Sequence, residues 1–382
     1  MTARCKACGS SSLQVFYDGG TVPAHSCVLL DDAVGAATYP TGEVVLEVCG
    51  DCAFIQNGLF DDALIDYGQD CEESQAFSPA FNAFAGELAR DLVDRYRLAG
   101  KEVVEIGCGK GDFLSLLVEA GIGSGTGVDP GYRAGRQSDH RLDFVVDLFE
   151  NVAGDLEADL VVCRHTLEHI AEVRYFTEAL AGVASRRSGA GVFVEVPDTV
   201  RVLTEGAFWD VYHEHCSYFT PGSLDRLLAG AGLTPDIRTA FSDQYLLAYS
   251  GRNERGRYDS VDEIAALAVS FGERVHHSID EWRSVLGSAV KEGRRPVLWG
   301  GGSKAIAFLA ALDLPEPMAA VVDINPYKQG KFLAGSGLEV IEPRGLLGID
   351  PGLVVVMNGI YTEEITESLH AMGLRPDVTA LG

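Results

Sequence analysis

Positive charge is scarce in this sequence. It holds 30 Lys and Arg residues against 56 Asp and Glu, which gives a formal net charge of −26 at pH 7 and a pI near 4.6. A field of this sign repels phosphate backbones and anionic lipid, so we expect neither nucleic acid nor a membrane surface as a partner. An anionic small molecule would need a local cluster of Arg or Lys.

Long apolar runs and a leader-like start are also missing. The longest apolar stretches, such as 44–48 and 353–357, have the length of a strand and fall far below the roughly 20 residues of a membrane span. The first five residues, Met-Thr-Ala-Arg-Cys, lack the apolar core of a signal peptide, so we expect a cytoplasmic protein. With 382 residues, of which 47% are hydrophobic, the chain is globular and long enough for two or three domains.

The cysteines do not form an even set. Nine cysteines in a long chain disfavour a disulfide scaffold and suit a reducing compartment. Four of them form two pairs, Cys5-Lys-Ala-Cys8 and Cys49-Gly-Asp-Cys52. Two such pairs can hold a tetrahedral Zn²⁺ ion, and four thiolates leave no position for water, so we predict a structural zinc site. The alternatives are four ordinary buried or redox thiols, or iron in place of zinc.

Strand and helix patterns divide the chain into three parts. Residues 1–75 have the pattern of short strands and turns around the cysteine pairs. Residues 76–250 begin with an amphipathic helix and then alternate strands and helices, which predicts a doubly wound parallel sheet. Residues 251–382 begin with a polar linker at 251–256, continue with a long helix over about 261–290, and then alternate again. We therefore predict an α/β fold with a small zinc module followed by two α/β domains.

A glycine-rich turn follows the first strand of the middle part. Apolar residues end at Ile106, Gly107, Gly109 and Gly111 follow, and a helix begins directly afterwards. In a dinucleotide site the third glycine comes one residue later, at the position that Asp112 occupies here. A carboxylate at a helix N-terminus satisfies the amides itself and would repel a pyrophosphate. The turn therefore disfavours NAD.

This turn resembles the S-adenosylmethionine (SAM) loop of class I methyltransferases. The resemblance rests on the acidic strand end at Glu105, on the glycines Gly107, Gly109 and Gly111, and on Asp129 at the end of the second strand. It implies that these residues bind SAM, that Asp129 accepts hydrogen bonds from both ribose hydroxyls, and that Asp147 holds the adenine amino group. The alternative for either aspartate is a solvated cap or loop residue.

Histidines gather after two later strands of the same part. His169 follows the fourth strand, and the run Tyr212-His213-Glu214-His215 follows the fifth. Ligands of open α/β sheets lie beyond the carboxyl ends of the strands, so both segments can reach the crevice of the glycine turn. Methyl transfer to carbon needs a base that removes a proton next to a carbonyl and a donor that stabilises the oxyanion.

We assign His215 as the base and Glu214 as its orienting partner or as a ligand of a substrate hydroxyl. Tyr212 and His169 are assigned as polarising or positioning groups, and His213 receives no role. Metal ligation, or an aromatic patch that packs the edge of the sheet, is the alternative interpretation of these residues.

The whole chain resembles the sugar C-methyltransferases of deoxysugar and antibiotic pathways, which join a zinc module, a SAM domain with a Tyr-x-Glu-His segment and a Rossmann-like C-terminal domain. In the last part the resemblance rests on residues 298–304, 321–330 and 356–365. It implies C-methylation of a nucleotide-linked keto-deoxysugar, with the C-terminal domain closing over the sugar nucleotide. Tyr67 matches, loosely, a tyrosine-containing stretch that the family has between the first two domains.

The chain departs from this family at two places. It has Gly109-Lys110-Gly111 where the family usually has Asn-Asp-Gly, and Glu168 where the family commonly has Ala. Lys304 and Lys328 are candidates for contacts to a diphosphate, or else solvated surface charges. The alternative functions are O- or N-methylation of another small metabolite, or a non-catalytic protein that binds SAM. The sequence leaves the oligomeric state open.

Overall fold

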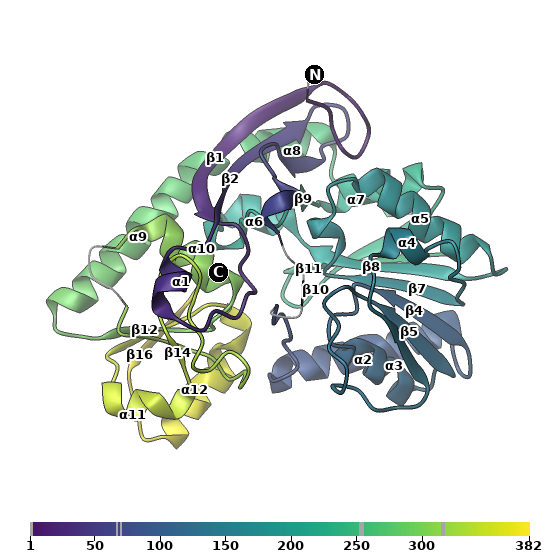
Figure 1. The fold of residues 1–382 in the computed structure, drawn as a ribbon. Helices are drawn as coiled ribbons and strands as arrows, with labels where there is room; N and C mark the ends of the chain where they lie inside the picture. The colour runs from purple at the N-terminus through teal and green to yellow at the C-terminus, as the bar shows by residue number, and fades with distance from the viewer. Residues whose placement is uncertain (1–2, 66–67, 69–70, 252–255, 315–317) are drawn as a thin grey trace.

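The computed structural model describes residues 3–65, 68, 71–251, 256–314 and 318–382, and it contains three β-sheets (Figure 1). Tyr67 and residues 252–255 of the expected linker lie outside the described residues. The sheets have four, seven and five strands. The limits that we predict between the domains stay predictions.

The four-stranded sheet is antiparallel and lies near the N-terminus. Its order is β1-β2-β3-β9, with a short helix α1 (Ala33–Ala37) between its first two strands. The strands are β1 (Leu13–Pro23), β2 (Thr41–Cys49), β3 (Ile55–Asn57) and β9 (Ser217–Tyr218). The last strand comes from the segment that follows the histidine run, so a part of the chain more than 150 residues away completes this sheet.

The seven-stranded sheet has the order β10-β11-β8-β7-β4-β5-β6, in which only β11 runs against its neighbours. Its strands are β4 (Glu102–Ile106), β5 (Ser124–Val128), β6 (Leu142–Val145), β7 (Leu160–Arg164), β8 (Gly191–Pro197), β10 (Pro235–Ala240) and β11 (Tyr245–Ser250). This confirms the class I methyltransferase α/β fold that the resemblance implies, and the sheet is parallel, as the strand and helix pattern predicts, except at β11.

Helices cover both faces of this sheet (Figure 1). Along β7, Leu160 and Val162 pack toward one face, while Val161 and Cys163 pack toward the other, so the strand is apolar and buried up to Arg164 at its end. The first face carries α2 (Pro79–Tyr96) and α3 (Asp112–Ala120), and the second carries α4 (Phe149–Val152), α5 (Val173–Ser185) and α7 (Pro221–Gly230).

The five-stranded sheet is parallel, with the order β14-β13-β12-β15-β16. Its strands are β12 (Pro296–Trp299), β13 (Ala320–Val322), β14 (Val340–Ile341), β15 (Leu353–Val356) and β16 (Asp377–Ala380). Helices α9 (Phe271–Lys291) and α10 (Ser303–Leu312) pack on one face, and α11 (Leu346–Ile349) and α12 (Thr362–Ala371) pack on the other. The single long helix expected over 261–290 is divided at Ser270, where α8 (Val261–Val269) ends and α9 begins.

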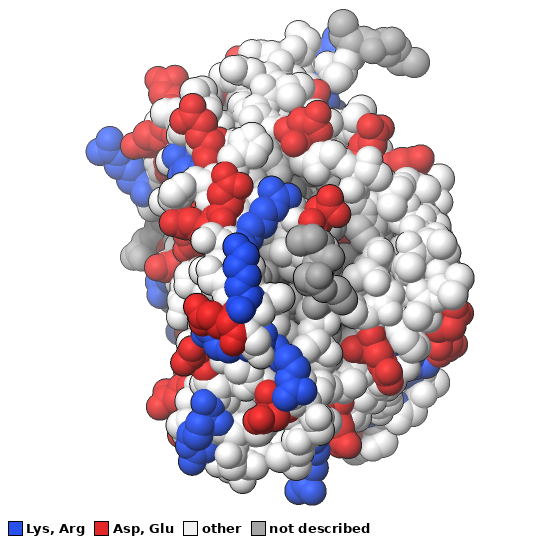
Figure 2. All heavy atoms as spheres, turned by 90° about the vertical axis from the view of Figure 1, so that its left-hand side faces the viewer, with Lys and Arg blue, Asp and Glu red and all other residues white. Residues whose placement is uncertain are grey.

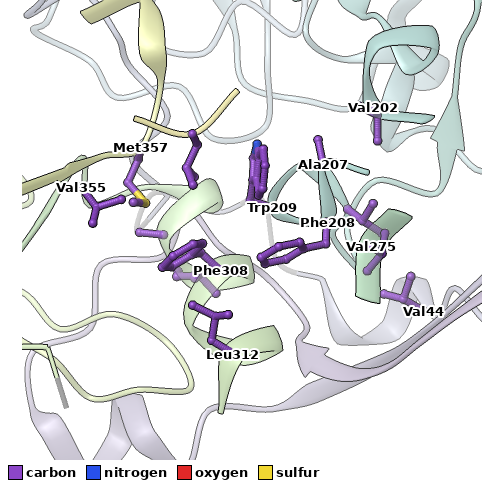
Figure 3. Packing of buried hydrophobic residues seen from close by; sticks show 14 of the residues in the cluster. Val44, Val202, Ala207, Phe208, Trp209, Val275, Phe308, Leu312, Val355 and Met357 are labelled. Atoms are coloured by element: carbon purple, nitrogen blue, oxygen red, sulfur yellow. The ribbon is translucent and has the colours of Figure 1, made fainter. Parts of the chain in front are cut away.

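One apolar core joins the first and third sheets to the segment before the histidine run (Figure 3). The segment enters this core through helix α6 (Thr199–Glu205) and the 3-10 helix η3 (Phe208–Asp210). Phe208 of η3 lies against Phe308 of α10 with ring centroids 6.0 Å apart, and Val44 of β2 belongs to the same core. The histidine run is therefore fixed between two other parts of the chain.

The acidic side chains are dispersed over the face in Figure 2, among basic and uncharged residues. Within the described residues, none of the helices combines the length and the apolar composition that crossing a membrane requires.

Candidate active site

The glycine turn joins β4 to α3 and forms a tight cradle. Gly107, Gly109 and Gly111 have φ values of +69°, +53° and +80°, a region that L side chains rarely adopt. A Cβ atom on Gly107 would lie 1.9 Å from Thr166 Oγ1, and one on Gly109 would lie 2.5 Å from Glu73 Oε1. The backbone conformation therefore favours glycine at all three positions, and at Gly107 the Thr166 side chain also leaves no space for a Cβ atom.

Two acidic residues flank this cradle. Asp129, which follows β5, accepts hydrogen bonds from the N–H groups of Gly109 (2.8 Å) and Gly131 (2.7 Å), and burial raises its pKa. Glu105 is 2% exposed, and burial raises its pKa to about 8. Its Oε2 atom has no hydrogen-bond partner in the part of the chain that the structure describes. A buried oxygen of this kind requires a partner that a cationic ligand group could supply.

Asp147 lies differently from the other predicted SAM residues. Its Oδ1 accepts hydrogen bonds from Leu148 N (2.8 Å), the residue before α4, and from Asn151 Nδ2 (2.7 Å) within that helix, so these two donors occupy it locally. It does not belong to the described residues that line the cavity, although its neighbour Leu148 does. The adenine contact of Asp147 stays a prediction.

A single cavity of about 800 Å³ connects the glycine turn, the histidine run and the C-terminal sheet. Its wall includes seven of the predicted site residues, namely Glu105, Gly107, Gly109, Asp129, His169, Tyr212 and His215. Gly111 and Glu214 lie outside the described lining, and the C-terminal part contributes Gly300, Gly302, Lys304 and Lys328. The structure thus brings the glycine turn, the histidine run and the C-terminal part of the chain to one cavity.

His169 and His215 are in contact at this wall. Their ring centroids are 4.7 Å apart at 87°, and the Tyr212 ring lies 4.7 Å from His215. Burial lowers the pKa of each histidine to about 3, so both imidazoles are neutral near pH 7. A neutral imidazole can accept a proton.

Asp210, which the sequence analysis did not single out, organises the other side of Tyr212. It accepts hydrogen bonds from the Tyr212 hydroxyl (3.0 Å) and from Lys304 Nζ (2.5 and 2.6 Å), and it also pairs with Arg201. Although burial alone would raise it, these two cations hold the pKa of Asp210 below its usual range. Lys304 thus links α10 of the C-terminal part to the predicted catalytic segment instead of lying in solvent.

The remaining members of the histidine run point away from the cavity. Glu214 is buried, its Oε1 accepts hydrogen bonds from the N–H (3.1 Å) and the hydroxyl of Ser26, and burial raises its pKa to about 8. His213 is fully buried, and its Nδ1 donates to the Glu43 carbonyl oxygen at 2.9 Å. His213 therefore packs the run against the N-terminal sheet.

A charged network at the end of β7 supports this wall and was also missed. His165 has φ +48°, an uncommon conformation for a residue other than glycine, and its ring nitrogens lie 3.1 Å from Glu195 and 3.5 Å from Glu168. Although burial alone would lower it, these two carboxylates raise the pKa of His165 to about 9. Cys163-Arg-His-Thr after a buried strand was the only sequence signal for this network.

The four paired cysteines meet at one end of the N-terminal sheet. The Sγ atoms of Cys5 and Cys52, and those of Cys8 and Cys49, are 3.6 Å apart, and all four lie within 4.8 Å of one another. Zinc–sulfur bonds of about 2.3 Å in a tetrahedron place sulfur atoms roughly 3.8 Å apart, so the cluster fits Zn²⁺. The zinc ion would join the segment before β1, which carries Cys5 and Cys8, to the end of β2 and the turn after it, which carry Cys49 and Cys52.

Comparisons with known proteins agree with this arrangement. A methyltransferase domain family matches residues 81–236, and a C-methyltransferase C-terminal domain family matches residues 255–375. The C-methyltransferase NovU of Streptomyces niveus is 27% identical over 394 residues, which cover 95% of this chain and 91% of that protein. The ubiquinone biosynthesis O-methyltransferase of Nitrosospira multiformis is 27% identical over 41% of this chain and 72% of its own length.

Among solved structures, the 1,6-didemethyltoxoflavin-N1-methyltransferase of Burkholderia thailandensis, with bound S-adenosylhomocysteine, is 14% identical with a TM-score of 0.37. It covers 53% of this chain and 97% of that chain. The magnesium protoporphyrin IX methyltransferase of Synechocystis PCC 6803 is 17% identical with a TM-score of 0.36, covering 49% of this chain and 91% of its own.

Proposed function

Because this chain belongs to the methyltransferases that carry a C-methyltransferase C-terminal domain, we propose that it moves the methyl group of SAM to a carbon next to a carbonyl. The acceptor in this proposal is a nucleotide-linked keto-deoxysugar. The observation that carries the proposal is the shared cavity, in which the glycine cradle and the neutral imidazole of His215 line one space.

The donor fits the cradle on three grounds. The backbone of Gly107 and Gly109 allows close approach, since any Cβ there would meet Thr166 or Glu73. The Asp129 carboxylate keeps lone pairs for the two ribose hydroxyls in addition to its two backbone bonds. The buried Oε2 of Glu105 suits the ammonium group of the amino-acid part. When bound, SAM supplies an electrophilic methyl group.

The residues of the chain would prepare the acceptor carbon. The His215 imidazole takes the proton from the carbon beside the carbonyl. Tyr212 then turns its single O–H from Asp210, to which it donates in the free protein, toward the developing oxyanion. Asp210 and Lys304 hold the Tyr212 hydroxyl in position. The electron pair of the broken C–H bond forms the new bond to the methyl carbon, while the bond from that carbon to sulfur breaks and its electron pair leaves with S-adenosylhomocysteine. The imidazolium later releases its proton to water.

Two supporting parts complete the proposal. A structural zinc ion on Cys5, Cys8, Cys49 and Cys52 stabilises the N-terminal sheet. The C-terminal domain contacts the nucleotide, for which Lys328 and the turn at Gly300 and Gly302 line the same cavity.

The test separates proton removal from methyl transfer. Incubation with SAM and a panel of nucleotide keto sugars should give S-adenosylhomocysteine and a product heavier by one methylene, with the position read by NMR. Without SAM, the same sugars should exchange the proton beside the carbonyl for deuterium. His215→Ala should abolish this exchange, while His213→Asn, checked for folding by circular dichroism, should retain it. Exchange that persists in His215→Ala would remove His215 as the base, and methylation of oxygen or nitrogen would contradict the proposed reaction.

A further inference from the structure

Three side chains at the cavity wall form a group that the proposed reaction does not fully use. Glu168 and His169 lie in the 3-10 helix η2 (Leu167–His169), and His215 lies in the loop before β9. One carboxylate oxygen and one nitrogen from each imidazole lie within 4.8 Å of one another. All three residues line the cavity.

Glu168 lacks a partner for half of its carboxylate. The residue is 2% exposed, and Oε1 lies 3.5 Å from Nδ1 of His165. Oε2 is buried and has no hydrogen-bond partner among the residues that the structure describes. Because a buried carboxylate oxygen without a partner is strongly destabilising, this atom points to a ligand that the wall itself does not provide.

The two histidines are set up to offer nitrogen lone pairs. His169 Nδ1 lies 3.2 Å from the Glu214 carbonyl oxygen, and since a carbonyl only accepts, Nδ1 carries the proton and Nε2 carries the lone pair. A backbone carbonyl on the other ring nitrogen is the usual outer contact of a metal-bound histidine. No hydrogen bond joins a ring nitrogen of His215 to any residue in the described ranges, and the ring lies edge-on against His169, Tyr212 and Tyr218.

We propose that Glu168, His169 and His215 bind a divalent transition-metal ion of the zinc class, at a site separate from the four cysteines. Two imidazoles and one carboxylate are a ligand set of Zn²⁺ and Co²⁺, whereas Mg²⁺ and Ca²⁺ prefer oxygen ligands. Bonds of about 2.1 Å in a tetrahedron place ligand atoms roughly 3.4 Å apart, so a bound ion would draw the three side chains together from the 4.8 Å within which they lie. The fourth position faces the cavity.

The ion acts as an inhibitor, and this part of the inference rests on the proposed function. His215 would use the same nitrogen lone pair to bind the metal and to remove the proton. It can therefore do only one of the two at a time. Occupied sites should therefore show no proton removal, and catalysis should need a metal-free His215.

Cobalt titration of the whole protein, with zinc already on the cysteines, tests the site. Calorimetry should find one further equivalent of Co²⁺, and its visible spectrum should lack the intense sulfur-to-cobalt charge transfer of a thiolate site. Glu168→Gln should weaken this binding by at least about tenfold, because it replaces an inner ligand. Glu364→Gln is the matched control, since Glu364 also lines the cavity but bonds Ser78. His169→Gln should reproduce the loss if Glu168→Gln fails to fold.

Each other result has a defined meaning. Absence of a further equivalent, or binding unchanged in both Glu168→Gln and His169→Gln, overturns the site. A thiolate spectrum also overturns it, because it would assign the ion to Cys27 and Cys71, which line the same cavity.

Deuterium exchange into the acceptor then tests inhibition. The metal concentration that halves exchange should equal the dissociation constant, and both should rise by the same factor in Glu168→Gln. Exchange that continues at full rate with the site filled would overturn inhibition and the assignment of His215 as base, while the metal site would stand. Failure of metal binding would leave the proposed methyl transfer intact.

Discussion

Replacement of Asp129 by Asn gives the sharpest test of the donor site. The carboxylate accepts two backbone N–H groups, from Gly109 at 2.8 Å and Gly131 at 2.7 Å, and in our proposal it also accepts the ribose hydroxyls. Asn has the same shape but only one acceptor oxygen, so its NH₂ group faces a donor. Loss of one hydrogen bond to a charged acceptor is worth about 1.5–3 kcal/mol. At 1.4 kcal/mol for each factor of ten, affinity should fall roughly 10- to 150-fold.

Isothermal titration with S-adenosylhomocysteine measures this loss directly. Asp143→Asn is the control, because Asp143 is exposed on β6 and makes the same change of charge outside the cradle. Its affinity should stay within about threefold of the wild type. If Asp129→Asn, with unchanged circular dichroism, also stays within about threefold, the contact to the ribose diol is refuted.

Three further changes test other parts of the structure. Gly42→Ala should lower the free energy of unfolding in urea by about 1–3 kcal/mol or more, because the new Cβ would lie 2.4 Å from the buried His213 ring. Gly182→Ala is the control and should not lower it, because a Cβ there would have nothing within 4 Å. Equal effects of the two changes would contradict this packing. Cys8→Ser should abolish the binding of one equivalent of zinc, measured by atomic absorption, and should lower the melting temperature. Cys8 is exposed, so the change itself should not disturb packing, and zinc that is retained would exclude the four-cysteine site. Burial raises the pKa of Asp198 to about 7, so ionisation makes the folded state less stable as pH rises from the ordinary aspartate pKa of about 4 toward that value. Asp198→Asn should therefore gain stability relative to the wild type between about pH 4 and pH 7 in denaturant titrations, and a difference that stays constant over this range would contradict the shift.

Local patterns were enough to predict the glycine cradle and its carboxylate. Strand, turn and helix follow one another between Glu102 and Ala120, and Asp129 follows the adjacent strand. Because ligands bind at the carboxyl ends of parallel strands, this order alone predicts that the glycine turn and Asp129 lie at one site. The separation within the histidine run was not predictable. Four neighbouring polar residues give no sign that His215 faces the cavity while His213 packs under Gly42.

Contacts across the chain were the other part that sequence reasoning could not reach. Asp210 and Lys304 are 94 residues apart, and each alone has the composition of a surface charge. Only the packing of η3 against α10 brings them together, through apolar residues whose partners have no local signal. Glu73, which lies before α2, also meets the cradle, where one of its carboxylate oxygens is 3.5 Å from Nζ of Lys110.

The pairing of β9 with β3 has a practical consequence for anyone who cuts or recombines these proteins. Ile55 pairs with Tyr218 and Gln56 with Ser217, so β9, which comes shortly after His215 in the chain, belongs to the N-terminal sheet next to the four cysteines. A fragment that starts at the middle sheet would leave this strand with an open edge, which favours aggregation. Hybrid enzymes made by exchanging the first part between relatives therefore have to carry both partners of this pairing from the same parent.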